Sequence, residues 1–318
     1  MTRRRQKRNQ QAFWATQPGL FDVRPEAEAD DALKALPDDA LKVPEALRYM
    51  SFGSGSSGNC SYLGTPSCGI LIDAGVDNNY VVEQLALNSI DPDGIVGILL
   101  THDHSDHVRY AYALLRRFRH MRLYATPKAF NGLLRRHSMS RRIKDYHVAI
   151  YKEFPFDAGI FHITAFETSH DGTDNSGFAI TALGQTFVVA TDTGTITSRA
   201  DFYIRQAQHL MIEANYDATM LRNGRYPQYL KARIASTIGH LDNADTARYL
   251  AAIAPAGILR RVWLCHLSQD NNTPQTALTT VREALEAAGI AIARDPRDSD
   301  HLTLEALPRL TASSLTVL

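Results

Sequence analysis

Residues 101 to 107 bring together side chains that could bind metal ions. The segment is Thr-His-Asp-His-Ser-Asp-His, and its potential ligands are His102, His104, Asp106 and His107. Their spacing cannot place all four on one face of a helix or a strand, so we expect a loop. Such a loop can offer one pair of ligands to one ion and the other pair to a neighbouring ion. Neutral imidazoles with carboxylates suit zinc, manganese or iron better than calcium or magnesium.

Short apolar runs, typical of buried strands, precede this loop and other metal-capable residues. The runs are residues 69–72, 95–100, 160–166, 176–182, 186–190, 209–214 and 261–265. Five of them are followed by a residue that can bind metal, in order Asp73, His102, His170, Asp192 and His266. Because buried strands hold adjoining loop residues within small tolerances, this shared placement predicts one rigid site.

Helical patterns alternate with the apolar runs, at residues 79–88, 108–120, 127–136, 229–236, 244–253 and 274–288. The alternation predicts an α/β protein in which helices cover sheets. Residues 1–48 differ in composition, with a basic tip followed by an acidic, proline-containing stretch. We expect a mobile tail there, although the basic tip could instead contact nucleic-acid phosphates, and a single hydrolase domain over residues 49–318.

Composition gives little direct information about a partner. The chain has 318 residues with 34 Lys and Arg against 34 Asp and Glu, so any preference for nucleic acid must be local. Its three cysteines, Cys60, Cys68 and Cys265, indicate neither a disulfide framework nor a thiolate zinc site. No apolar run is long enough for a membrane span or a secretion signal, which favours a cytoplasmic protein without a membrane partner.

Motifs along residues 49–302 resemble those of the metallo-β-lactamase superfamily, and within it the YycJ/WalJ/VicX-like exonuclease branch. They are SFGSGSSGNC (51–60), LIDAG (71–75), THDHSDH (101–107), SHD (169–171), ATDTG (190–194), EANYD (213–217), LKARI (230–234), GHLDN (239–243) and HLSQDNNT (266–273). The resemblance implies an αβ/βα four-layer sandwich, two mixed sheets with helices outside, and metals at one edge.

The resemblance also implies a set of ligands for two divalent ions, zinc or manganese, with iron as a further candidate. His102, His104 and His170 would hold one ion, and Asp106, His107 and His266 the other. Asp192 would bridge the two ions, and Asp73 would orient a ligand imidazole.

Two such ions lower the pKa of a shared water, so a bridging hydroxide would attack the phosphodiester. We count Asp106 and His240 as catalytic, with His240 in the GHLDN motif serving the leaving oxygen; the alternative is that His240 only caps a helix or lies in a surface turn. Asn271 and Asn272 could bind substrate phosphate or hold their loop, and the sequence does not separate these roles.

Residues 116–144 contain ten Lys or Arg and no Asp or Glu, interrupted by Phe118, Tyr124 and Phe130. This excess predicts a phosphate-contacting surface, with a solvated helix face as the alternative. The candidate substrate contacts are Arg135, Arg136, Arg141 and Arg142.

The predicted function is therefore a metal-dependent nuclease, by resemblance a 5′ to 3′ DNA exonuclease, with DNA favoured over RNA and the oligomeric state open. The alternatives are an RNA-processing nuclease, a thioester or lactam hydrolase, and a non-catalytic accessory protein. Only 22 positions separate His170 from Asp192, which leaves no room for the substrate arm of tRNA-processing relatives. The 74 positions from Asp192 to His266 are likewise too few for a large inserted cap domain.

Overall fold

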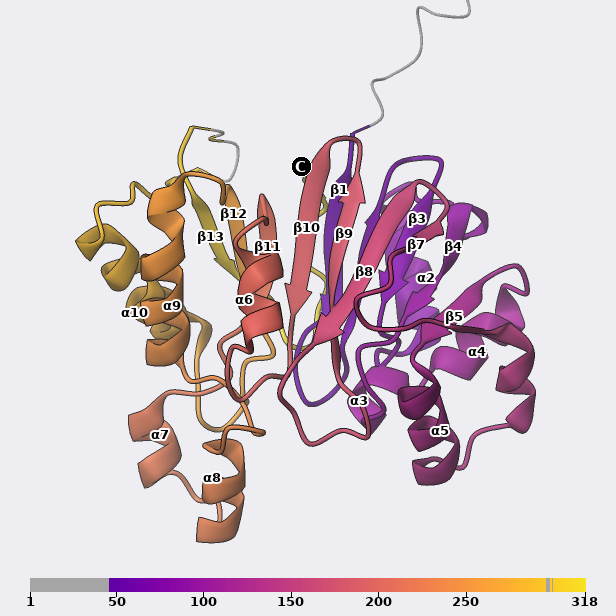
Figure 1. The fold of residues 1–318 in the computed structure, drawn as a ribbon, viewed down its shortest axis with the longest axis horizontal. Coiled ribbons are helices and arrows are strands. Elements are labelled where there is room, and N and C mark those ends of the chain that lie inside the picture. The colour runs from indigo at the N-terminus through magenta and orange to yellow at the C-terminus, as the bar shows by residue number, and fades with distance from the viewer. Residues whose placement is uncertain (1–45, 296–297, 299) are drawn as a thin grey trace, which may run out of the picture. The chain divides into compact units, whose positions relative to one another are not determined.

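The computed structural model describes residues 46–295, 298 and 300–318, so nearly all of the predicted tail, residues 1–48, lies outside the described residues. Two seven-stranded sheets form the centre of the described domain (Figure 1). The first contains, in spatial order, β14 (Thr316–Val317), β1 (Arg48–Gly53), β2 (Cys60–Gly64), β3 (Gly69–Ile72), β4 (Ile95–Leu99), β5 (Arg122–Ala125) and β6 (His147–Ala149). The second contains β13 (Thr303–Ala306), β12 (Arg261–Cys265), β11 (His209–Glu213), β10 (Gln185–Ala190), β9 (Ser176–Ala182), β8 (Phe161–Glu167) and β7 (Phe156–Ala158).

Each sheet is mixed, with a parallel part and an antiparallel part. In the first sheet β3 to β6 run parallel, and in the second β10 to β13 run parallel. The sheets bury apolar side chains against each other, including Tyr49 and Leu99 from the first and Phe178 and Trp263 from the second. The carboxyl ends of the parallel strands are therefore available on both sheets to carry loop residues.

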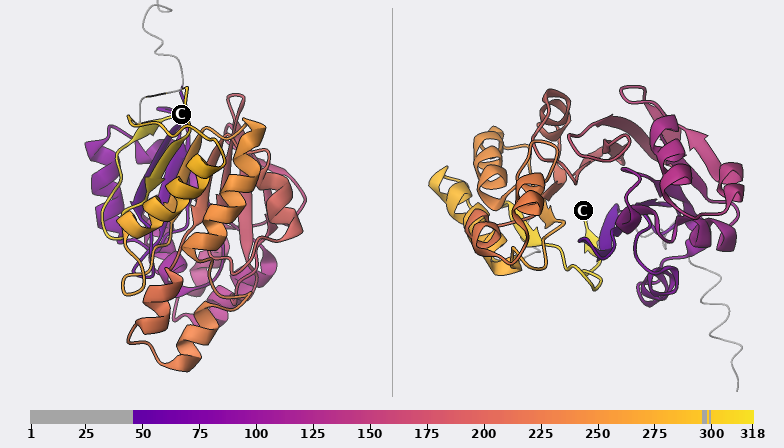
Figure 2. Two further views of the ribbon diagram at one scale, coloured as in Figure 1. Left: turned by 90° about the vertical axis from the view of Figure 1, so that its left-hand side faces the viewer. Right: turned by 90° about the horizontal axis from the view of Figure 1, so that it is seen from below.

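Helices cover the outer face of each sheet (Figures 1 and 2). Residues of α2 (Asn78–Leu87), α4 (Ala111–Arg117) and α5 (Pro127–Arg136) share a core with the first sheet. Residues of α6 (Ser198–Ile204), α9 (Asn243–Ile253) and α10 (Pro274–Ala287) share a core with the second. The remaining short helices are α3 (Ser105–Val108), α7 (Ala218–Asn223), α8 (Gln228–Ile234) and the 3₁₀ turns Pro92–Gly94, Arg141–Tyr146 and Ala254–Ala256. This arrangement confirms the predicted αβ/βα sandwich.

The prediction of one continuous helix over residues 108–120 is wrong. The chain forms α3 and then α4, with a break at Arg109 and Tyr110, and α4 ends at Arg117. The Tyr110 N–H donates to the carbonyl of Ala74, 2.9 Å away, instead of to a carbonyl of its own helix. A contact with a distant loop therefore overrides the local helical pattern.

Candidate metal centre

The metal-capable residues of both sheets meet at one edge of the sandwich. Asp73 follows β3, Asp192 lies two residues after β10 and His266 follows β12. All three have left-handed backbones, with φ of 60°, 49° and 54°. Such φ values are uncommon for residues other than glycine and tend to occur where the surrounding structure fixes a functional side chain. The backbone conformation at the strand ends thus sets the direction of these side chains.

A glycine lets two segments of the site pack tightly. A Cβ atom built on Gly75 would lie 1.5 Å from the carbonyl oxygen of Asp106, which no side chain could tolerate. Nearby, the Asn59 N–H donates to that same carbonyl over 2.8 Å, and the Asn59 side-chain amide donates to Asp106 Oδ2 over 3.2 Å. Asp106 and His107 lie in the short helix α3, whereas a loop was expected over residues 101–107, and this helix is held from two directions.

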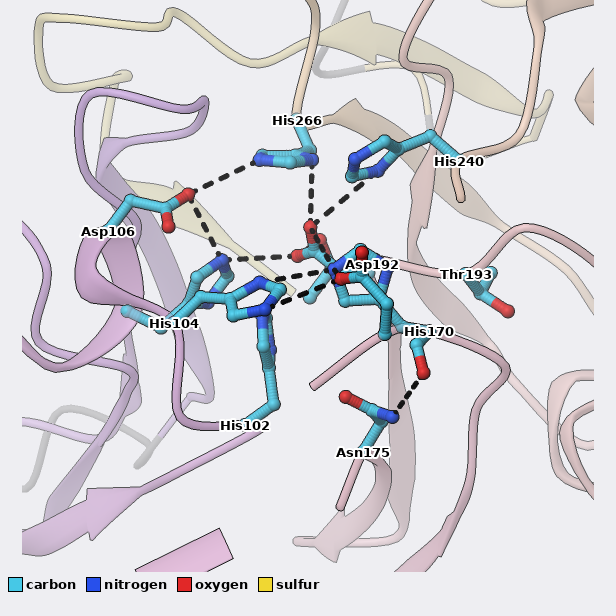
Figure 3. Close-up of polar contacts among 12 residues, drawn as sticks. His102, His104, Asp106, His170, Asn175, Asp192, Thr193, His240 and His266 are labelled. Carbon is cyan, nitrogen blue, oxygen red and sulfur yellow. Dashed lines mark hydrogen bonds and ion pairs between the residues drawn. The ribbon is translucent and has the colours of Figure 1, made fainter. Parts of the chain in front are cut away.

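Three histidines form the first group of possible ligands, His102, His104 and His170 (Figure 3). Their ligand atoms lie within 4.8 Å of one another, and His170 Nε2 is 3.3 Å from His104 Nδ1. The His170 Nδ1–H donates to the carbonyl of Gly239 over 2.9 Å, which leaves Nε2 free to face the group. His102 is 1% exposed, and within the described part of the chain its Nε2 has no hydrogen-bond partner.

A second group consists of Asp106, His107 and His266. Asp106 Oδ2 lies 3.5 Å from His107 Nε2 and 3.6 Å from His266 Nε2. The buried His266 Nε2 also lacks a hydrogen-bond partner among the described residues. Two buried imidazole nitrogens without partners, one in each group, are the state expected of atoms arranged to bind something else.

Asp192 lies between the two groups (Figure 3). Its Oδ2 is 3.2 Å from His107 Nε2, and its Oδ1 is 3.0 Å from His266 Nδ1 and 3.9 Å from His170 Nε2. The structure thus brings together all seven residues predicted as ligands.

Asp73 stands behind His107 and fixes its orientation. His107 Nδ1–H donates to Asp73 Oδ2 over 2.7 Å, while Asp73 Oδ1 accepts from the Thr101 N–H over 2.9 Å. This contact directs His107 Nε2 toward Asp106 and Asp192. A carboxylate behind a histidine is the usual support of a metal-binding imidazole.

Glu213, the last residue of β11, is a functional candidate that the sequence prediction missed. It is fully buried, and its Oε1 accepts from His240 Nδ1 over 2.7 Å and lies 2.8 Å from His266 Nδ1. Its Oε2 accepts from the Thr193 N–H over 2.8 Å. A charged residue within the apolar run 209–214 was the available signal, because a buried charge requires partners.

Asp171 is a second residue that the prediction overlooked. Its Oδ1 lies 3.4 Å from His104 Nε2 and 3.5 Å from His170 Nε2, and its Oδ2 pairs with Arg233 Nη2 over 2.6 Å. It borders the more open side of the site, where the side chains of His104 and Asp106 are 23% and 16% exposed.

The carboxylates set the protonation of the buried imidazoles. Burial alone would lower the pKa of His266, but Asp192, Asp106 and Glu213 together raise it to about 10. Burial lowers the pKa of His102, which has no carboxylate in hydrogen-bonding contact. Because a metal competes with protons for such nitrogens, metal binding at this site displaces protons.

The two asparagines predicted after His266 lie below the surface. Asn271 is 1% and Asn272 is 4% exposed. Asn272 Nδ2 donates to the carbonyls of Ala214 and Asn215 over 2.9 and 3.1 Å. Of the two roles considered, this placement supports holding the loop and gives no support to contact with substrate.

All ten cations of residues 116–144 are exposed. Arg136 Nε lies 3.5 Å from the buried Asp103, whose backbone carbonyl accepts from His137 Nε2 over 2.7 Å. The interleaved ring of Phe130 is buried and stacks on His147. The surface of this segment therefore carries positive charge, while its aromatic rings belong mostly to the core.

Residues 69–267 match the family described as "Beta-lactamase superfamily domain". The chain belongs to this superfamily. The exodeoxyribonuclease YycJ of Bacillus anthracis is 32% identical over 254 residues, which cover 77% of this chain and 92% of that protein. The exodeoxyribonuclease WalJ of Streptococcus pneumoniae is 33% identical and covers 78% and 92%. The predicted resemblance is confirmed, and the chain is a hydrolase of the metallo-β-lactamase fold.

Solved structures of the superfamily share this fold at low sequence identity. The metallo-β-lactamase fold protein YhfI of Bacillus subtilis has a TM-score of 0.59 and 14% identity, covering 85% of this chain and 99% of that one. Unliganded yeast PDE1 has a TM-score of 0.59 and 12% identity, covering 84% and 99%. The fold implies divalent metal ions, and the two residue groups are candidate ligands. No helix in the described part of the chain is long and apolar enough to cross a membrane.

Proposed function

We propose that the chain is a DNA exonuclease that hydrolyses phosphodiester bonds with two divalent ions, zinc or manganese. The observation that carries this proposal is the pair of imidazole and carboxylate groups joined by Asp192, in a chain similar to two exodeoxyribonucleases. Degradation from the 5′ end is the polarity that we expect.

The donor atoms fit two such ions. His102, His104 and His170 would hold one ion, Asp106, His107 and His266 the other, and Asp192 would contact both. The unpartnered Nε2 atoms of His102 and His266 support this assignment, because a ligand would satisfy both. When bound, two divalent ions lower the pKa of a shared water and stabilise the attacking and leaving oxygens of an in-line displacement.

His240 is suited to handle the proton of the leaving oxygen. Its Nδ1 donates to the buried Glu213, which fixes the orientation of the ring. Its side chain is 19% exposed, and its ring centroid is 4.9 Å from that of His170 and 5.2 Å from that of His266. We therefore assign His240 as the proton donor and Glu213 as the residue that positions it.

The exposed cations of residues 116–144 supply the substrate surface of this proposal. The segment begins near the end of α4, the helix that follows α3 with its Asp106 and His107, and continues through α5. A nucleic acid needs such a surface, because neutralised phosphates release counterions on binding. A small neutral lactam has no comparable use for ten cations.

The test is cleavage of end-labelled duplex DNA, single-stranded DNA and RNA by the metal-loaded protein. We expect progressive shortening of DNA from the 5′ end, lost in His104→Ala and Asp192→Ala but retained in the control His162→Ala, an exposed histidine on β8. The RNA arm matters because ribonuclease J of Helicobacter pylori is 27% identical over 212 residues, 28% of that protein. Cleavage of RNA alone, or of no nucleic acid by protein with two bound ions, would overturn the proposal.

A further inference from the structure

A polar cavity lies at the end of the second sheet opposite to the metal centre. His209 opens β11, whose last residue Glu213 reaches the metal centre, so the two sites are roughly 13 Å apart along that strand. The cavity measures about 280 Å³ and is lined by Gln185, Gln208, His209, Arg260, Arg261, Asp298, His301, Thr303 and Leu318. This is close to the lower end of ligand pockets, roughly 300 Å³.

Two adjacent arginines line this cavity, Arg260 exposed and Arg261 half-buried, and the charge of Arg261 acts on the nearby carboxylate of Glu305. Within the described residues, neither Arg260 nor Arg261 forms an ion pair, and the buried Nη1 of Arg261 has no hydrogen-bond partner. Asp298 also lines the cavity, but its Oδ2 pairs with His301 Nδ1 over 2.8 Å. An unpaired guanidinium in a partly closed cavity is costly unless an anion occupies it.

His209 supplies a third group that lacks a partner. It is 2% exposed, and its Nε2–H donates to Gln185 Oε1 over 2.5 Å. Its Nδ1 is buried and has no hydrogen-bond partner among the residues that the structure describes. The hydrogen bond to Gln185 therefore fixes the ring so that only Nδ1 is available to a ligand.

We propose that this cavity binds a small phosphate-bearing anion, held by the guanidinium groups of Arg260 and Arg261 and by the imidazole of His209. Two guanidinium groups can each offer paired N–H donors to the oxygens of one phosphate, and this geometry is their most favourable contact with an anion. The cavity is larger than one oxyanion requires, so a phosphate monoester fits as well as inorganic phosphate. The metal centre does not take part in this site.

Protons should couple to the binding of the anion. Burial and the two arginines lower the pKa of His209 to about 4. An anion between the arginines offsets their charge, and a protonated His209 then donates to it through Nδ1. The other titratable groups that line the cavity are Asp298 and His301, and Glu305 of the neighbouring strand β13 acts on Arg261. Binding of sulfate, whose charge is constant over this range, therefore tightens as the pH falls toward 5, and the effect is lost in His209→Gln but not in His301→Gln.

The experiment is calorimetric titration of the metal-loaded protein with inorganic phosphate, sulfate and a deoxynucleoside 5′-monophosphate. We expect Arg261→Gln to weaken binding of the phosphate group by at least about tenfold, the effect of one lost charge-assisted contact. Arg261→Lys keeps the charge but loses the paired donors, and gives an intermediate affinity. The control Arg248→Gln removes an exposed arginine of α9 that does not line the cavity, and it leaves binding unchanged.

The titrations separate this site from the metal centre. Phosphate binding that survives in His104→Ala and weakens in Arg261→Gln supports the proposal, and tighter binding of the nucleotide than of inorganic phosphate identifies a monoester as the ligand. Binding that is unaffected by Arg261→Gln, or that disappears in His104→Ala, overturns it. Failure of the exonuclease assay would leave this result unaffected, because the readout is binding.

Discussion

Replacing Asp73 with asparagine tests how the metal centre depends on a carboxylate behind it. Asparagine adopts positive φ as readily as aspartate, so the backbone at φ 60° is unaffected. Its single oxygen can keep the bond to the Thr101 N–H, now 2.9 Å long, and its amide nitrogen then faces His107 Nδ1. Two donors cannot pair, so the His107 proton moves to Nε2. That nitrogen lies 3.2 Å from Asp192 and is the atom needed as a ligand.

The expected loss follows from the energetics of such supporting contacts. Removing a partner of this kind costs about 10- to 100-fold in metal affinity, which corresponds to about 1.4 to 2.7 kcal/mol. When the protein is dialysed against increasing concentrations of a chelator, Asp73→Asn should therefore lose its metal at a lower chelator concentration than the wild type. Nuclease activity should return when manganese is added in excess.

The matched control is Asp217→Asn, because Asp217 caps α7 through the Met220 N–H and asparagine caps helices equally well. This variant should keep wild-type metal affinity. The reasoning is refuted if Asp73→Asn retains wild-type metal affinity, or if excess manganese fails to restore activity while the fold is intact.

Three further predictions address the substrate surface, the proton donor and the fold. Replacing four exposed arginines with glutamine should weaken DNA binding, as measured by fluorescence anisotropy; the residues are Arg135, Arg136, Arg141 and Arg142. The magnitude of the slope of log K against log salt should decrease by up to about 3. An unchanged slope would remove them from the substrate path. His240→Gln should lower kcat by about 10²- to 10⁴-fold with metal content unchanged, and equal loss of both would instead make His240 a ligand. His209 has a folded pKa of about 4, below the ordinary 6.5, so the unfolded chain binds more protons between these values and stability falls as the pH decreases from 6.5 to 4. The full cost is about 3 kcal/mol, and urea unfolding at pH 7 and pH 5 should show a smaller pH dependence in His209→Gln than in the wild type.

Strands and helices with a clear local sequence signal, such as an apolar run or a helix-start residue, could be predicted from the sequence. The expected strand 176–182 matches β9, and the expected helix 127–136 matches α5, because Thr126 caps it and Pro127 begins it. Short strands such as β6 and β14 were not predicted, since pairing with neighbours, more than composition, makes them strands.

The candidate site divides in a similar way. The ligand residues could be predicted because each follows an apolar run and belongs to a motif. Glu213 and Asp171 were missed because their roles depend on distant partners, His240 and His266 for the first and Arg233 for the second. The break at Tyr110 likewise depends on a hydrogen bond to Ala74 that no local pattern encodes.

The left-handed backbones of Asp73, Asp192 and His266 set stability and activity against each other. A non-glycine residue in a sparsely populated backbone region costs of order 1 to 3 kcal/mol, which glycine avoids. At these positions a glycine variant should therefore be more stable than the alanine variant, the reverse of the order within a strand. Selection of random variants for thermal resistance alone would accumulate glycine here and yield sturdy but inactive proteins, so any engineering of this scaffold must select for activity and stability together.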